Sequence, residues 1–247
     1  MYKRINHENI ENYDQQEIIC TLQRQEDTYN MDITTFGGTV ALGDISNAMD
    51  NVITLIKTYI CTVMNLSNNN ITSDYVEDIV EALKENSTII SLDLSNNNIG
   101  TGLGQAWGSR AYKLSKILVD YEFLDGSRQP LDPPNTLTTL NLSNNNIIGN
   151  SIVWMAGELT ANTSLTTLDL SNNNLGNNGA VFLADSLYSN QTLTTLDISN
   201  NNIGDEGGQY LVDSIHNKGY SNQTLTYINV SGNPIHSNLL DSIHFLI

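Results

Sequence analysis

One pattern of hydrophobic and polar residues recurs along the chain and predicts one strand and one helix in each copy. Five segments are nearly identical: TVMNLSNNNI (62–71), ISLDLSNNNI (90–99), TTLNLSNNNI (138–147), TTLDLSNNNL (166–175) and TTLDISNNNI (194–203). A sixth copy, TYINVSGNPI (226–235), is looser. Alternating leucine-like residues predict a short strand, and the helical spacing of apolar residues in the remainder of each copy predicts a helix.

The spacing between the central apolar residues of successive strands gives the length of the repeat. These residues are Leu66, Leu94, Leu142, Leu170, Ile198 and Val230 in the six copies. The spacings are 28, 48, 28, 28 and 32 residues, so the unit is 28 residues, with insertions near 112–135 and at 217–220. Because one strand and one helix cannot bury their own apolar faces, the copies are predicted to stack into a solenoid.

The copies resemble the leucine-rich repeat in its 28-residue, ribonuclease-inhibitor-like form. The resemblance covers roughly residues 61–247. It implies an α/β horseshoe with a parallel sheet on the concave face and helices on the convex face. Ran GTPase-activating proteins and the sensor domains of innate-immune receptors share this form. The resemblance therefore implies a protein-binding scaffold and no single activity.

An asparagine occupies the ninth position of every copy, and we expect these residues to form a structural ladder. They are Asn69, Asn97, Asn145, Asn173, Asn201 and Asn233. An amide both donates and accepts hydrogen bonds, so it can satisfy the inward-facing backbone groups of a turn. A row of ligand-binding amides is the alternative.

The two ends depart from the repeat. Residues 1–60 are predicted to form an N-terminal helical cap and a degenerate first coil, with a polar helix around 6–25. An independent adaptor domain is the alternative. Residues 61–247 hold the six repeats, and the last helix is expected to act as a lid over the final strand. A monomer is favoured, and a dimer through an open C-terminal edge is the alternative.

Charge and cysteine content exclude several classes of function. The chain has 27 acidic and 10 basic residues, a net charge of −17, which argues against nucleic acid and anionic membranes as partners. Two cysteines are too few for a disulfide scaffold or a multi-cysteine zinc module. Cys20 is expected in the polar helix and Cys61 in a buried strand position. No catalytic residue, metal site or cofactor is predicted.

Two surfaces are candidate binding sites for another protein. The rim insertions concentrate aromatic and basic side chains, which are common at binding hot spots: Arg110, Lys113, Tyr121, Phe123, Arg128, Lys218 and Tyr220. The concave face carries acids and one aromatic residue: Asp93, Asp169, Asp197 and Tyr227. The alternatives are a longer helix with solvated bases at the rim and a solvated polar surface on the concave side.

These features predict a non-enzymatic protein-recognition module. The Asn-rich repeats resemble those of proteins from intracellular bacteria and protists, which suggests a bacterial effector that binds a host protein. The N-terminal segment has no apolar signal core, so we expect a cytoplasmic protein or one delivered into a host cell without a signal peptide. The alternatives are a GTPase-activating protein using Arg110 or Arg128, and a structural subunit assembling through its C-terminal edge.

Overall fold

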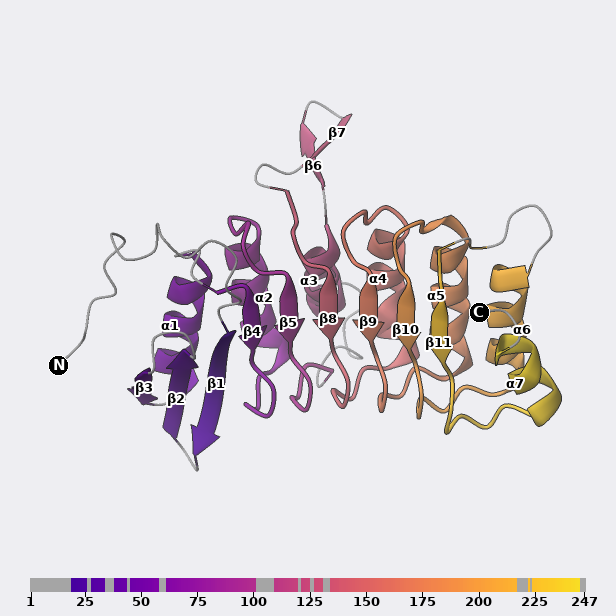
Figure 1. Cartoon of the computed structure of the whole chain (residues 1–247), viewed down its shortest axis with the longest axis horizontal. Helices are drawn as coiled ribbons and strands as arrows, with labels where there is room; N and C mark the ends of the chain where they lie inside the picture. The colour runs from indigo at the N-terminus through magenta and orange to yellow at the C-terminus, as the bar shows by residue number, and fades with distance from the viewer. Residues whose placement is uncertain are drawn as a thin grey trace.

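The computed structural model describes residues 19–25, 28–33, 38–43, 45–57, 61–100, 109–119, 121–124, 127–130, 134–216, 222 and 224–244. Figure 1 shows a row of short strands with a row of helices behind it. The strand order is β11-β10-β9-β8-β5-β4-β1-β2-β3, and the first seven strands in this order run parallel. The chain is therefore an α/β solenoid, as predicted.

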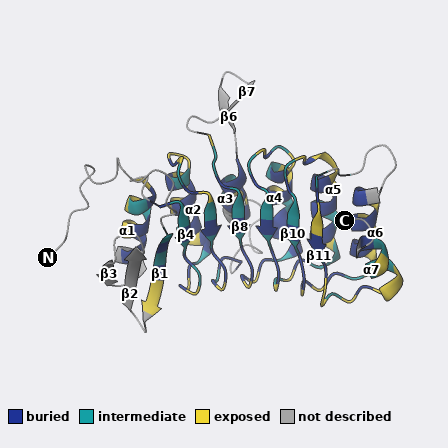
Figure 2. Cartoon of the chain, in the orientation of Figure 1, coloured by how far each residue is buried: buried dark blue, intermediate teal, exposed yellow. Residues whose placement is uncertain are grey.

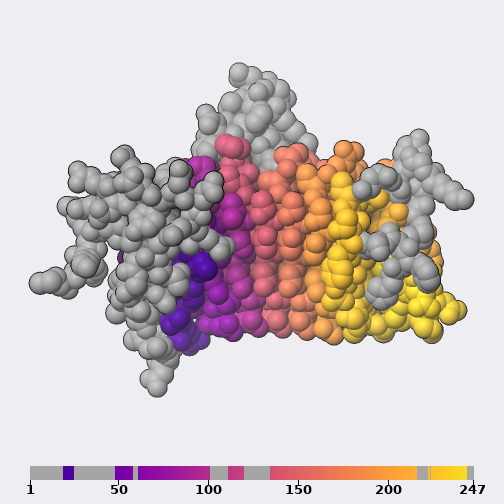
Figure 3. Space-filling model, viewed as in Figure 1, coloured from indigo at the N-terminus to yellow at the C-terminus, as the bar shows by residue number. Residues whose placement is uncertain are grey.

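Each repeat contributes three strand residues. The strands are β4 (Val63–Asn65), β5 (Ser91–Asp93), β8 (Thr139–Asn141), β9 (Thr167–Asp169), β10 (Thr195–Asp197) and β11 (Tyr227–Asn229). They pair in register from coil to coil, so equivalent positions form rows across the sheet. In the space-filling view each repeat forms one band of a continuous surface (Figure 3).

The helices follow the strands on the other side of the sheet. They are α2 (Ser73–Leu83), α3 (Ser109–Ser115) with η3 (Lys116–Leu118), η4 (Gly149–Ser151) with α4 (Ile152–Leu159), α5 (Gly176–Ser189), α6 (Asp205–His216) and α7 (Ser237–His244). The core lies between the two layers (Figure 2). Leu168 and Leu170 of one copy, for example, are fully buried together with Leu183 and Leu187 of α5.

The predicted polar helix around 6–25 is wrong over residues 19–25. These residues form the strand β1 (Ile19–Gln25), which runs parallel to β4 and antiparallel to β2 (Thr28–Ile33). Cys20 and Leu22 are buried while the residues beside them are less so, because β1 covers the first coil and faces its core. The part of the prediction that precedes residue 19 lies outside the described residues.

The rest of the cap combines a sheet edge with one helix. β3 (Gly38–Gly43) pairs antiparallel with β2, and α1 (Ile45–Lys57) follows. Ala48 and Val52 of α1 are buried, which is the helical face expected for a degenerate coil. The cap is therefore a strand meander plus a helix, rather than helical throughout.

The two cysteines form a disulfide, which the sequence analysis did not foresee. Cys20 in β1 is bonded to Cys61, two residues before β4, with a Cα–Cα distance of 5.9 Å. Both residues are fully buried, as expected for Cys61. The bond links the cap to the first repeat across 41 residues of chain.

The five asparagine triplets hold 15 of the chain's 35 asparagines. The middle residue of each triplet supplies the ladder. Asn97, for example, accepts at Oδ1 from the backbone N–H groups of Asn69 and Ile71, each at 2.9 Å. The first residue adopts a left-handed conformation, with φ of 52° at Asn96 and 53° at Asn172, which asparagine tolerates better than most residues.

The larger insertion contains a β-hairpin. β6 (Tyr121–Leu124) and β7 (Ser127–Pro130) pair antiparallel and form their own two-stranded sheet. Figure 1 shows this hairpin projecting from one rim of the main sheet. The smaller insertion, 217–220, lies outside the described residues.

Candidate protein-binding surfaces

The inner face of the sheet presents one partly exposed polar side chain from the last position of each strand. These residues, which we call the inner row, are Asn65, Asp93, Asn141, Asp169, Asp197 and Asn229. Their Cα atoms are partners in the register of neighbouring strands, so the row crosses the whole repeat array. Asp169 and Asp197 are adjacent members.

Every member of the inner row is held by the turn that follows its strand. Asp169 accepts at Oδ1 from the backbone N–H of Ser171 at 2.8 Å, and Asp197 accepts from that of Ser199 at 2.9 Å. The same bond recurs at each of the other four members. Since Asn and Asp both offer an Oδ1 acceptor, the turn accommodates either residue, and the choice between them sets only the charge.

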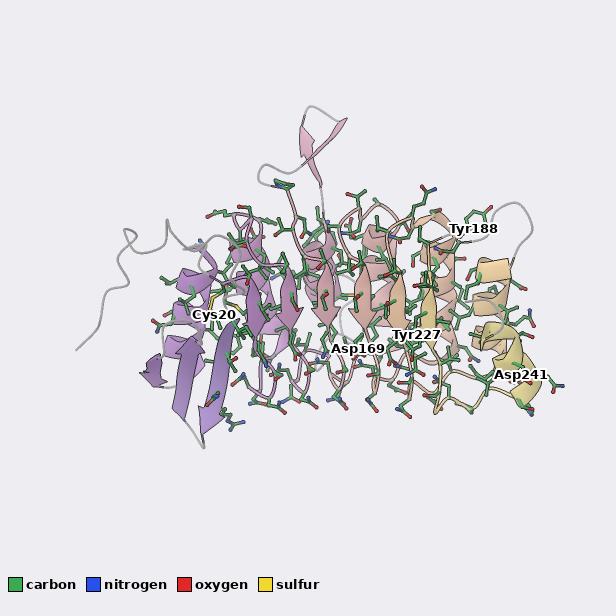
Figure 4. All side chains as sticks on the ribbon, in the orientation of Figure 1. Cys20, Asp169, Tyr188, Tyr227 and Asp241 are labelled. Carbon is green, nitrogen blue, oxygen red and sulfur yellow. A yellow bond between two sulfur atoms is a disulfide. The ribbon has the colours of Figure 1, made fainter. Side chains whose placement is uncertain are left out.

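Tyr227 is the aromatic residue at the C-terminal end of this face. It lies on β11 with 53% of its surface exposed, and its register partner on β10 is Thr195. Figure 4 labels both Tyr227 and Asp169, which lie on β11 and β9 of the same sheet with β10 between them. Two strand positions along, Asn229 donates to Oδ2 of Asp197 at 2.8 Å, so both carboxylate oxygens of Asp197 already accept a hydrogen bond within the chain.

The structure describes only part of the rim candidates. Tyr121 and Phe123 lie on β6 and Arg128 on β7, and the Cα atoms of Phe123 and Arg128 are register partners. Arg110 lies in α3. The side chains of these four residues, and all of Lys218 and Tyr220, lie outside the described residues.

The GTPase-activating alternative needs an arginine on an exposed loop. The backbone places Arg110 in a helix and Arg128 in a strand of the hairpin. Neither residue therefore has the loop position that this alternative requires.

Lys113 lies between helices rather than on the rim. Its Nζ donates to Oε2 of Glu77 on α2. The ammonium group of Lys113 is therefore already paired within the chain, which sets this residue apart from the other rim candidates.

A cluster on the helical side was missed by the sequence analysis. Nζ of Lys116 lies 4.3 Å from the ring centroid of Tyr112 and 2.7 Å from Oε1 of Glu158. The Tyr112 ring packs edge-on against Trp154 of α4, with centroids 5.5 Å apart and planes at 83°. Partial burial lowers the pKa of Lys116, but its hydrogen bonds to Glu158 and Tyr112 outweigh this and raise it above its ordinary value. Aromatic residues at solvent-facing helix positions are the signal that could have revealed it.

A second row of asparagines, between each helix and the next strand, was also missed. Asn190 donates to the carbonyl of Leu159 at 2.7 Å and accepts from the N–H of Leu193 at 2.8 Å. Asn86, Asn162 and Asn222 bridge neighbouring coils in the same way. Asn135 makes the same bond to the following residue, Leu137, but donates to the carbonyl of Ile117 within its own coil. The recurring Asn two or three residues before the apolar residue that precedes each strand was the available signal.

Comparison with known families identifies the repeat. A family model described as "Leucine Rich repeat" matches residues 85–102, 134–153, 161–184, 189–212 and 221–238. The chain is a leucine-rich repeat protein. Leucine-rich repeats form protein–protein interaction modules and are generally non-enzymatic binding scaffolds.

Other comparisons add little to this family assignment. Among solved structures, the leucine-rich repeat protein is similar to the actin-binding site 2 of leiomodin-1, with 17% sequence identity and a TM-score of 0.47. The similarity covers 80% of this chain and 86% of that one, and it is too remote to inform function. The comparison with curated proteins gives no match.

Two features are absent from the part of the chain that the structure describes. No group of three or more His, Cys, Asp or Glu side chains in that part of the leucine-rich repeat protein is arranged to hold a metal ion. No helix in the same part has the length and apolar character needed to cross a membrane.

Proposed function

We propose that this leucine-rich repeat protein recognises another protein through its inner face, with the β6–β7 hairpin contributing at the rim. The observation that carries the proposal is the inner row, in which every side chain is held by a hydrogen bond from its own turn. Side chains that are already ordered lose less conformational freedom on binding, so more of the contact energy becomes affinity.

Charge indicates what kind of partner fits the inner face. Asp169 and Asp197 project from neighbouring strands, which lie about 4.8 Å apart, and Asp93 lies on the same face beyond the intervening Asn141. Like charges at this spacing repel, and a partner that brings basic side chains relieves the repulsion. Tyr227 adds an exposed aromatic contact at the end of the row.

The test begins with a partner recovered by affinity mass spectrometry and continues with its dissociation constant. Asp93→Asn, Asp169→Asn and Asp197→Asn in one variant remove three charges but keep the Oδ1 acceptor that each turn uses. We expect this variant to bind about tenfold more weakly and to lose from its stability only the hydrogen bond from Asn229 to Asp197, about 1 kcal/mol.

A matched control separates the inner face from net charge. Asp50→Asn, Asp78→Asn and Asp241→Asn remove the same charge from exposed positions on α1, α2 and α7. We expect these changes to leave affinity within about twofold. Equal weakening by both triple variants would show that the partner responds only to overall charge and would overturn the proposal.

The hairpin has its own test. Tyr121→Ala with Phe123→Ala is compared with the wild type for partner recovery, and Lys218→Ala with Tyr220→Ala tests the smaller insertion. Loss of recovery supports a role for the rim. Unchanged recovery in both variants removes the rim from the proposal and leaves the inner face as the binding site.

We also propose that the protein is an effector that passes through an oxidising compartment on its way to a host cell. Disulfides form and persist in oxidising compartments, so the Cys20–Cys61 bond favours a chain that passes through one. Delivery into a host cell is compatible with such a passage, whereas a reducing cytoplasm disfavours the bond. Alkylating free thiols in intact cells and counting the modified cysteines tests this passage. Two free thiols at every stage of the protein's production and delivery would contradict it.

A further inference from the structure

Neighbouring members of the inner row present side-chain atoms that the chain itself does not use. These members are Asn65, Asp93, Asn141 and Asp169. In each, Oδ1 accepts the bond from the turn, and the other polar atom has no hydrogen-bond partner within the described part of the chain. That atom is the donor Nδ2 in the asparagines and the acceptor Oδ2 in the aspartates. Along β4, β5, β8 and β9 the inner face therefore offers donor, acceptor, donor and acceptor.

The alternation stops at the next member of the row, Asp197. Its Oδ1 accepts from the N–H of Ser199, and its Oδ2 accepts from Nδ2 of Asn229 at 2.8 Å. Both of its oxygens are therefore occupied within the chain, whereas Asp93 and Asp169 each keep one oxygen for a partner. Because the three aspartates carry the same charge, this difference separates a specific contact from general attraction to negative charge.

The two open aspartates have a spacing that selects the conformation of a bound segment. Asp93 lies on β5 and Asp169 on β9, with Asn141 of β8 between them in register. At about 4.8 Å per strand, the two carboxylates are about 9.6 Å apart along the row. A polyproline II helix rises about 3.1 Å per residue with about three residues per turn, so its residues i and i+3 face the same side about 9.3 Å apart. An extended strand repeats on one side every ~6.8 Å, which does not match.

The donor between the two carboxylates favours the same conformation. Nδ2 of Asn141 faces the position that lies between the two basic side chains of a bound segment. The backbone of a polyproline II helix makes no internal hydrogen bonds, so its carbonyl groups are free to accept from this donor. The carbonyl groups of an α-helix are already bonded within the helix. The inner face therefore fits a polyproline II segment better than a strand or an α-helix.

An exposed aromatic ring lies further along the same face. Tyr227 is on β11, two strands beyond Asp169, and 53% of its surface is exposed (Figure 4). Its register partner on β10, Thr195, has a small side chain, so the ring is not covered from that side. Polyproline II segments commonly dock on exposed aromatic residues. Tyr227 therefore offers a packing surface for a proline that follows the second basic residue.

We propose that the inner face binds a proline-rich segment of a partner protein in the polyproline II conformation, with Arg or Lys at two positions three residues apart. The two cations pair with Asp93 and Asp169. A backbone carbonyl between them accepts from Asn141, and a later proline packs against Tyr227. This inference rests on the proposed function, because it uses the same face, and it adds the charge, conformation and spacing of the bound segment.

The first experiment measures the binding of fluorescein-labelled peptides to the full chain by fluorescence anisotropy. The peptide Pro-Pro-Arg-Pro-Pro-Arg-Pro-Pro has the proposed spacing. Pro-Pro-Pro-Arg-Arg-Pro-Pro-Pro has the same composition with adjacent arginines, and Gly-Gly-Arg-Gly-Gly-Arg-Gly-Gly has the same spacing on a flexible backbone. We expect the first peptide to bind about tenfold more tightly than either control. Equal binding of the three peptides, or no binding of the first, would overturn the inference.

The second experiment uses paired variants of equal net charge with the first peptide. Asp93→Asn with Asp169→Asn removes the two open acceptors, and we expect about tenfold weaker binding. Asp197→Asn with Asp241→Asn removes the same charge from an occupied inner-row position and from α7, and should change binding by less than about twofold. Tyr227→Leu should weaken binding about threefold, while Tyr227→Phe should bind like the wild type. Equal losses in the two charge variants would show attraction to overall charge and contradict the inference.

The two experiments can fail separately from the test of the proposed function. If the triple aspartate variant loses the recovered partner while the three peptides bind alike, the proposed function stands and this inference is wrong. If that variant keeps the partner, the proposed function itself is wrong. A cooperative melting transition in each variant confirms that it is folded.

Discussion

Cys20 and Cys61 are joined by a disulfide that ties the strand β1 to the first leucine-rich repeat. In a stacked array the terminal coil has a neighbour on one side only, so its strand is the one most easily lost to solvent. The bond lies next to the β1–β4 pairing, in which Cys20 and Met64 are register partners. The cap is therefore anchored covalently where the array begins.

Breaking this disulfide should destabilise the cap. For a sequence separation of 41 residues, the loss of the constraint on the unfolded chain is about 4 kcal/mol. Cys20→Ser with Cys61→Ser, or excess reductant on the wild type, should therefore lower the unfolding midpoint in urea. Hydrogen exchange should show the loss first in β1 and β2. Reductant should have no effect on the double variant, and an effect there would mean that another group is responsible.

Neighbouring asparagines of one triplet should respond differently to glycine. Asn97→Gly leaves the buried N–H groups of Asn69 and Ile71 without their acceptor, at a cost of about 3 kcal/mol or more. Asn96 has a φ of 52°, which glycine adopts freely, so Asn96→Gly should change stability by less than about 0.5 kcal/mol. Denaturant unfolding measures both. Equal effects would contradict the separate roles assigned to the two positions.

Two glycines, Gly149 just before α4 and Gly157 within it, provide another matched pair. A Cβ at Gly149 would fall on the backbone carbonyl oxygen of Leu175 in the next coil, so Gly149→Ala should cost about 1–3 kcal/mol. A Cβ at Gly157 would meet nothing within 4 Å, and Gly157→Ala should stabilise the helix by about 0.5–1 kcal/mol. Thermal unfolding of the two variants should therefore shift in opposite directions.

The contact between α6 and the turn before α7 should depend on pH. The backbone N–H of His236 donates to Asp205 at 2.7 Å and holds the pKa of that carboxyl below its ordinary value of 3.8. Because the pKa is lowered in the folded state, its contribution is present above pH 3.8 and is lost as the pH falls through the folded value.

Asp205→Asn keeps the acceptor oxygen but cannot titrate, so it isolates this contribution. The melting temperature of the wild type should exceed that of the variant near pH 6, and the gap should narrow as the pH falls below about 3.8. A gap that stays constant over this range would show that the carboxylate contributes no pH-dependent stability.

Much of the fold could be predicted because repeats encode local structure many times over. Alternation at Leu168 and Leu170 predicts a strand, and the helical spacing of Ala180, Leu183 and Leu187 predicts the helix that covers it. The repeat supplies the neighbour of each coil, so the partner of each strand is also encoded in the sequence.

The cap could not be predicted in the same way. Residues 19–25 contain enough polar side chains to suit a solvated helix, and they become a strand because the open edge of β4 is available for pairing. The distance between Cys20 and Cys61 follows from that pairing, so the disulfide was equally hidden. The inner-row acids were found from sequence, but their bonds to the following serines depend on turn geometry.

The sequence by itself determined the leucine-rich repeat, the alternation of strand and helix, the buried leucines and the asparagine triplets. These features follow from spacing within a unit, which local periodicity records. Only the tertiary structure decided where the cap pairs, which cysteines meet, and that Lys116 lies over Tyr112 and against Glu158. These relationships join segments that no shared period connects, so they arise only when the coils stack and their neighbours are present.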